Sequence, residues 1–246
     1  MVSYQLLIVA RDKIILGSDK DRFQVVLAIP FICIFALLVI VVVVGIRGEL
    51  NRGQNFRSVA EPLGLEFYGN DQQCLPIEID DLPLFRQGRA RQFSNIICGR
   101  SEDVCVAIFE YSFTLGARLH RNKQFYRQSV VSIQSPHLSL PAFELRPGNV
   151  LQKVICGFDN IEFDSHRRFS KRFLVRGRDE VSIRAAFTPQ VLEFFEQQSG
   201  TCVEATGNHF VFYRPRIWLS PNEVRSFMAE GFRVYALFKH QPKPNE

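Results

Sequence analysis

The organisation of this chain is decided by one stretch, FQVVLAIPFICIFALLVIVVVVGI, which occupies residues 23–46. No charged side chain occurs between Arg22 and Arg47. As a helix, these 24 residues rise roughly 36 Å, which exceeds the ~30 Å hydrocarbon core of a bilayer. Buried core helices rarely hold more than ~14 apolar residues in a row. The stretch therefore predicts a transmembrane helix.

A cleavable signal peptide is the main alternative to a permanent anchor. Its apolar region would be ~7–15 residues long and would end in small residues such as A-x-A. Here the apolar run is longer and ends in VVVVGIRG. We therefore predict an uncleaved, single-pass anchor that follows an N-terminal tail, residues 1–22.

The side of the membrane is harder to predict. Four Lys and Arg residues precede the stretch and three follow it closely, so the positive-inside rule does not decide the orientation. Five cysteines lie outside the stretch, an odd number with no CxxC spacing. This pattern favours a reducing compartment, and we expect the C-terminal domain to be cytoplasmic.

The composition of the 246 residues excludes several classes of protein. Hydrophobic residues make up 46% and charged residues 22%, which does not fit a disordered, collagen-like or coiled-coil chain. Thirty Lys and Arg against 25 Asp and Glu give a net charge of +5. This excess is modest, so we do not expect nucleic acid as a partner.

The rest of the chain predicts a soluble α+β domain over residues 56–240, joined to the anchor by a polar linker, residues 47–55, and followed by a disordered end, residues 241–246. A short helix is expected from Phe56, and a loop over 70–84. Alternating apolar and polar residues then predict an antiparallel meander. Its three strands are 104–113, 125–135 and 138–145. Pro141 should lie at an edge or a bulge of the sheet.

Two or three packed helices and a hairpin are predicted after the meander. The candidate segments for these helices are 149–156, Glu180 to Phe187, Pro189 to Gly200, and Ser220 to about Lys239. Thr188-Pro189 and the capping box Ser220-Pro221-Asn222-Glu223 are typical helix starts. The hairpin joins 201–205 to 209–213 through the turn Thr206-Gly207-Asn208.

Sequence signatures of enzymes are missing from the chain. It contains no HExxH, no Walker A sequence, no GxGxxG before a helix and no G-x-S-x-G elbow. The pair Asp80-Asp81 fits a turn better than a cation site. We therefore predict no catalytic residue, no metal site and no cofactor.

Three clusters of basic residues are the candidate binding residues. The first contains Arg86, Arg89 and Arg91; the second contains Arg118, Arg121 and Lys123; the third contains Arg167, Arg168, Lys171 and Arg172. Each cluster lies near aromatic residues in sequence. In a domain tethered to a membrane, such residues can contact anionic headgroups. The same composition could bind RNA phosphates, with Phe stacking on bases. The third interpretation is solvated loop charge that balances nearby acidic residues.

Several motifs of the soluble region resemble a family of uncharacterised bacterial membrane proteins with an N-terminal hydrophobic segment and a C-terminal α+β domain of unknown function. They are IFEYSFTLG (108–116), RQSVVSIQSPHLSLPAFELRP (127–147) and IEFDSHRRFSKRFLVRGRDEVSIRAAFTPQVLEFF (161–195). The resemblance covers residues 55–240. It implies a location in the bacterial inner membrane and supplies no catalytic residues.

The functional prediction is a non-catalytic binding or scaffold domain held at the membrane. Its expected partners are the lipid bilayer, through anionic headgroups, or another membrane protein. The alternative is a membrane-tethered enzyme with a dispersed active site that no sequence motif reveals. The oligomeric state is left open.

Overall fold

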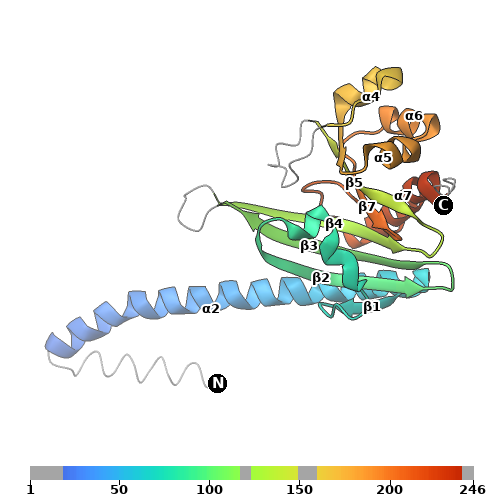
Figure 1. Cartoon of the computed structure of the whole chain (residues 1–246). Helices are drawn as coiled ribbons and strands as arrows, with labels where there is room; N and C mark the ends of the chain where they lie inside the picture. The colour runs from blue at the N-terminus through green and yellow to red at the C-terminus, as the bar shows by residue number, and fades with distance from the viewer. Residues whose placement is uncertain (1–18, 117–122, 149–159, 240–246) are drawn as a thin grey trace. The chain divides into compact units, whose positions relative to one another are not determined.

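Figure 1 shows the chain in a computed structural model. It describes residues 19–116, 123–148 and 160–239, and for residues 19–30, 77 and 78 it describes the backbone alone. The chain divides into two compact units, Met1–Arg52 and Gly53–Glu246. Most of the predicted N-terminal tail, the helix predicted at 149–156 and the C-terminal end 241–246 lie outside the described residues.

The elements follow one another along the chain as helices (α), short 3-10 helices (η) and strands (β). They are α2 (Asp19–Ala60), η1 (Glu61–Leu63), β1 (Glu66–Gly69), η2 (Ile77–Asp81), α3 (Pro83–Arg86), β2 (Arg89–Arg100), β3 (Cys105–Leu115), β4 (Gln124–Gln134), β5 (Leu140–Pro147), η3 (Asp164–His166), α4 (Arg167–Arg172), β6 (Phe173–Gly177), α5 (Glu180–Ala186), α6 (Pro189–Gln197), β7 (Cys202–Gly207), β8 (His209–Tyr213), η4 (Pro221–Glu223) and α7 (Val224–Lys239).

Helix α2 contains the whole apolar stretch. In the described part of the chain it is the one helix that is long and apolar enough to cross a membrane. Its apolar side chains from Phe31 to Ile46 are exposed. The helix also continues through residues 47–55, the predicted polar linker. Gly48 and Gly53 are tolerated because interior glycine costs only about 1 kcal/mol relative to alanine.

The second unit has the predicted α+β fold, built on one eight-stranded sheet with the order β1-β2-β3-β4-β8-β7-β5-β6. All neighbouring strands are antiparallel. Both the β3–β4 pairing and the β7–β8 hairpin confirm the prediction, and Gly207 adopts a left-handed φ of 57° in the hairpin turn. The predicted bulge near Pro141 is also present, because the β5–β7 register shifts between Leu140 and Phe143.

The predicted meander is wrong in its third strand. Strand β5 does not pair with β4, because the β7–β8 hairpin lies between them. Consecutive strands pair in only about two-thirds of cases, and here the later hairpin has the more continuous apolar strand, since all five residues of β8 are buried.

Strand β2 was missed because it is bent twice. Its register against β3 shifts between Arg89 and Gln92 and again between Ser94 and Ile97. Ala90 and Asn95 adopt a left-handed φ of 51° at these points. Each bulge interrupts the alternation of apolar and polar side chains, so the sequence of β2 lacks the period of two that reveals a strand.

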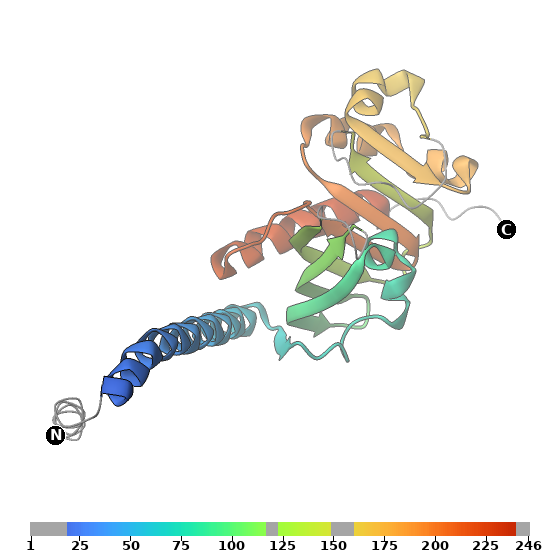
Figure 2. The ribbon, with the colours of Figure 1, turned by 90° about the vertical axis from the view of Figure 1, so that its left-hand side faces the viewer.

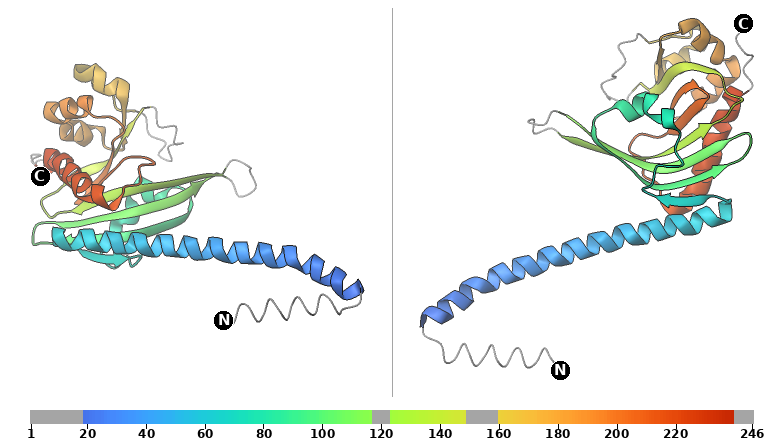
Figure 3. Two further views of the ribbon diagram at one scale, coloured as in Figure 1. Left: turned by 180° about the vertical axis from the view of Figure 1, so that it is seen from behind. Right: turned by 60° about the horizontal axis from the view of Figure 1, so that its bottom comes forward.

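The sheet buries apolar side chains on both faces. One face carries the larger core, covered by α5, α6, α7 and the end of α2 through residues such as Phe56, Phe195 and Phe227. Helix α7 lies against β8 and β4 (Figure 3). Helices α4, α5 and α6 gather at the β5–β6 end of the sheet (Figure 2).

The other face of the sheet is covered by the segment that contains η2 and α3, with Leu84 and Phe85 fully buried against Phe109 and Tyr111. The segment 70–86, of which 70–84 is predicted as a loop, therefore contains two short helices. We call it the cover segment.

Candidate functional site

The first basic cluster lies where α3 meets β2. The Arg86 guanidinium pairs with the Asp81 carboxylate at 2.6 Å. Arg91 donates a hydrogen bond to the carbonyl oxygen of Phe85, and Arg89 is half-buried in β2. Two of the three arginines therefore hold the local backbone and acidic groups of the cover segment.

The third basic cluster forms α4. Arg172 donates to the carbonyl oxygen of Gln198 at 2.7 Å and to that of Glu196, which satisfies the carboxyl end of α6. The other three members are exposed. Arg167 and Lys171 line a pocket of about 310 Å³.

The structure does not bring these two clusters together. The first adjoins β2 and the third adjoins β6, and five strands separate β2 from β6 in the sheet. In the second cluster Lys123 is exposed, whereas Arg118 and Arg121 lie outside the described residues.

A row of interacting side chains crosses the sheet close to Lys123. Asn95 on β2 donates from Nδ2 to Glu110 Oε2 at 2.9 Å. The same oxygen accepts from Arg127 on β4 at 3.1 Å. The Arg127 guanidinium lies 3.5 Å from the centroid of a Trp218 ring. Since the Glu110 side chain is 1% exposed and that of Arg127 is 25% exposed, the row leads from a buried carboxylate to an exposed aromatic edge.

Three exposed large hydrophobic side chains belong to β4 or to the segment beside it. They are Phe125, Ile217 and Trp218, and the fourth in the described part of the domain unit, Val181, lies on α5. Phe125 precedes Arg127 by two residues on β4 and therefore points to the same face of the sheet. We define the Trp218 surface as Phe125, Arg127 and Trp218, with the adjoining Ile217.

Backbone hydrogen bonds position the segment that carries Trp218. After β8 ends, the chain continues beside β4, where Ser129 N donates to the Ile217 carbonyl oxygen at 2.9 Å and Leu219 N donates to Ser129 Oγ at 3.2 Å. Arg216 turns the chain with a left-handed φ of 63°. Its guanidinium lies 4.7 Å from the centroid of the Tyr126 ring.

Sequence reasoning missed most of this surface. Trp218 is the one tryptophan of the chain, and it follows two arginines in RPRIWLS (214–220). Phe125 lies two residues after Lys123, a predicted contact residue. A lone tryptophan beside basic residues was the signal available, because tryptophan and arginine are enriched at binding surfaces.

Asn95, the first residue of the same row, lies beside the first residue of the domain unit, Gly53. A Cβ atom placed on Gly53, the first residue of that unit, would stand 3.7 Å from Asn95 Oδ1. The Trp218 surface is therefore connected to the start of the domain through Asn95, Glu110 and Arg127.

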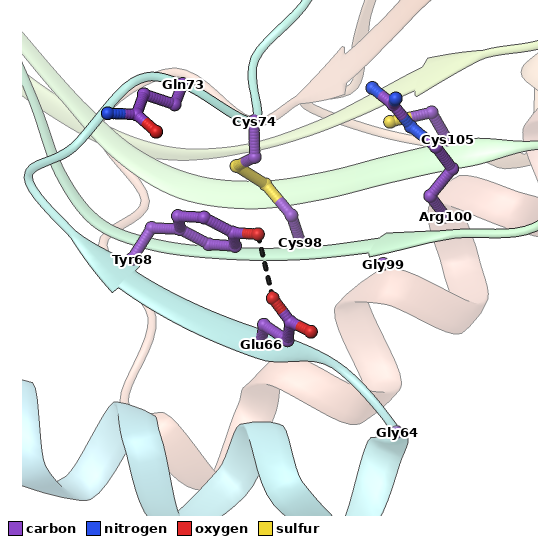
Figure 4. A pocket seen from close by; sticks show the side chains of 9 residues that line it. All are labelled: Gly64, Glu66, Tyr68, Gln73, Cys74, Cys98, Gly99, Arg100 and Cys105. Atoms are coloured by element: carbon purple, nitrogen blue, oxygen red, sulfur yellow. Dashed lines mark hydrogen bonds between the residues drawn. A yellow bond between two sulfur atoms is a disulfide. The ribbon is translucent and has the colours of Figure 1, made fainter.

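A second candidate site is a pocket of about 410 Å³ beside β1 and β2 (Figure 4). Its lining includes Glu66, Tyr68 and Arg100. The Tyr68 hydroxyl donates to Glu66 Oε2 at 2.8 Å, and this hydrogen bond raises the pKa of Tyr68. These two polar groups of the pocket thus bind each other.

A disulfide between Cys74 and Cys98 forms one wall of this pocket. It joins the cover segment to β2, with a Cα–Cα distance of 6.4 Å. The cysteine pattern was interpreted as one without pairing, and that interpretation is wrong, because cysteines 24 residues apart meet once the cover folds over the sheet. The expectation of a cytoplasmic domain therefore loses its support from the cysteines.

A buried polar cluster lies under α3, on the face of the sheet that the cover segment protects. Glu204 Oε2 accepts from Leu84 N at 2.7 Å, and Glu204 Oε1 accepts from the Tyr213 hydroxyl at 2.8 Å. Arg146 pairs with Glu204 at 3.4 Å and with Glu144. Neither pocket described above is lined by these residues.

Burial dominates the electrostatics of this cluster. It raises the pKa of Glu204, against the opposing effect of Arg146. It also raises the pKa of the Cys202 thiol to about 12 and that of Tyr213 well above its usual value. These groups face one another inside the domain, so the cluster fastens the cover segment to the sheet.

Comparisons with known proteins identify one similar solved structure. No protein-family model and no curated protein sequence matches the chain. The crystal structure of the mycobacterial trehalose monomycolate transport factor A, TtfA, matches with a TM-score of 0.54 and 13% sequence identity. The match covers 78% of this chain and 98% of that one. At this identity the likeness shows that the two proteins share a fold.

Proposed function

We propose that this chain is a single-pass, membrane-anchored and non-catalytic binding factor, whose α+β domain acts at the lipid surface. The observation that carries the proposal is the exposed apolar part of α2, which is covalently joined to a folded domain. An apolar surface of this size is unstable in water, whereas the hydrocarbon core of a bilayer accepts it.

Two further observations support a binding role. The titratable groups that burial perturbs most, such as Glu204 and Tyr213, are occupied in fastening the cover segment. The structure with the same fold is named a transport factor for trehalose monomycolate, and this name favours a non-catalytic, lipid-related role for the present domain.

The bilayer is the first partner of the proposed factor, and a membrane protein is the second. The exposed members of the basic clusters supply positive charge for anionic headgroups, each contributing about 1 kcal/mol near such a surface. The bacterial inner membrane is the location that the sequence resemblance implies, and it belongs to the same proposal.

Photoactivatable phospholipids test this function in membranes that contain the full chain. We expect cross-linked peptides both from residues 23–46 and from the domain after Gly53. Cross-links confined to the anchor would contradict the proposal that the domain acts at the lipid surface, and they would favour a protein partner. A matched reaction without illumination is the control.

A further inference from the structure

We infer that the Trp218 surface lies in the headgroup interface of the membrane that holds the anchor. This inference rests on the proposed function and specifies which face of the domain meets the lipid. Its occupant is the bilayer surface, and a second copy of the chain or another protein is an alternative that the experiment must separate.

The composition of the surface fits a bilayer interface. Phe125, Ile217 and Trp218 are 65%, 46% and 41% exposed, and they make up three of the four exposed large hydrophobic side chains in the described domain. Tryptophan is enriched at the headgroup level of membranes, where one part of the ring is in an apolar environment and its N–H is in a polar one.

The charge of the surface also fits a bilayer interface. Arg127 lies against Trp218, Lys123 precedes Phe125 by two residues, and the Glu110 carboxylate that pairs with Arg127 is buried, with 1% of its side chain exposed. The outward charge is therefore positive. Positive charge near the surface attracts anionic lipid within about a Debye length.

The covalent tether keeps the domain close to the membrane. Seven residues lead from Ile46, the end of the apolar stretch, to Gly53, and as a helix they rise only about 10 Å. The bilayer surface is therefore always near the domain.

The single tryptophan makes the inference directly testable. The full chain is reconstituted into vesicles of phosphatidylcholine with a minor fraction of phosphatidylglycerol, with and without bromine on the acyl chains. Because Trp218 is the one tryptophan of the chain, its fluorescence reports the surface alone. We expect bromine to reduce the fluorescence about two-fold, as for an indole at the interface.

Variants separate a lipid contact from other causes of quenching. The double variant Phe125→Ser, Ile217→Ser should recover at least half of the lost fluorescence. Val181→Ser is the matched control, because Val181 is 80% exposed on α5, and it should leave the quenching unchanged. Near-ultraviolet circular dichroism confirms that each variant is folded.

Three results would overturn the inference. Emission typical of water with no quenching places Trp218 in solvent. Blue-shifted emission without quenching means that protein covers the surface, including a second copy of the chain. Lipid cross-links in the domain without quenching of Trp218 leave the proposed function intact and assign the lipid contact to another face, whereas the absence of any domain cross-link contradicts the proposed function itself.

Discussion

At the scale of single residues, Glu204 joins the cover segment to the sheet. Its carboxylate accepts hydrogen bonds from Leu84 N and the Tyr213 hydroxyl and pairs with Arg146. We expect Glu204→Ala to lower the free energy of unfolding by about 1–3 kcal/mol, because it leaves the buried Leu84 N–H and Tyr213 hydroxyl without their acceptor. Urea unfolding of the full chain in detergent micelles measures this loss.

The pH dependence of the same site has a defined sign. Burial raises the folded-state pKa of Glu204, so its contribution to stability is present below the unfolded pKa and is lost as pH rises through the folded pKa. Glu204→Gln cannot titrate. Relative to this variant, the wild type should therefore lose stability as the pH is raised above the unfolded value of about 4; a difference that stays constant with pH would contradict the assignment.

The disulfide between Cys74 and Cys98 closes the other end of the cover segment. Replacing both cysteines with serine should lower the free energy of unfolding by about 3 kcal/mol, the usual value for a loop of this length. Cys105→Ser is the matched control, since Cys105 lines the same pocket as a free thiol. Alkylation of intact cells shows whether the bond forms there, and a formed bond places the domain in an oxidising compartment.

At the scale of elements, regular segments could be predicted from the sequence and bent segments could not. The strands near Phe109 and Val130 are unbroken runs rich in β-branched and aromatic residues. Helix α6 begins with a proline after Thr188, and η4, which leads into α7, begins with a proline after Ser220. Strand β2 lost its period at the bulges near Ala90 and Asn95. The order of strands in the sheet also cannot be predicted from the local alternation of apolar and polar residues. For this reason the sequence does not place the β7–β8 hairpin between β4 and β5.

Strand β6 illustrates how closely these elements pack. A Cβ atom on Gly177 would lie 2.4 Å from the Ala142 carbonyl oxygen and 2.4 Å from Ile183 Cδ1. Gly177→Ala should therefore destabilise the domain by about 1–3 kcal/mol, as overpacking does. Gly48→Ala is the control, because nothing lies within 4 Å of its Cβ position and alanine favours a helix. Equal thermal unfolding of both variants in micelles would contradict the packing of β5 against β6.

At the scale of the whole molecule, the two units were visible in the sequence, whereas the Trp218 surface was not. The charge-free stretch 23–46 is contiguous, so composition alone reveals it. Phe125 and Trp218 are 93 positions apart in sequence, and the segment with Trp218 comes beside β4 only because the chain after β8 runs along that strand. Of the predicted basic contact residues, Lys123 is exposed, whereas Arg91 and Arg172 bind backbone carbonyl groups.

The anchor and the Trp218 surface should make separable contributions to membrane binding. Phe35 and Leu38 lie in the middle of the apolar stretch, with exposed side chains. Replacing both with arginine should disfavour insertion by about 5–7 kcal/mol, at about 2.5–3.5 kcal/mol for each arginine near the bilayer centre. The double variant should leave the membrane fraction on alkaline carbonate extraction, whereas Leu50→Arg, beyond the stretch, should stay. Any binding that the double variant retains at low salt should weaken at high salt, since salt screens the charged part of the domain's contact with the membrane. Retention of the double variant through carbonate extraction would show that α2 is not the anchor.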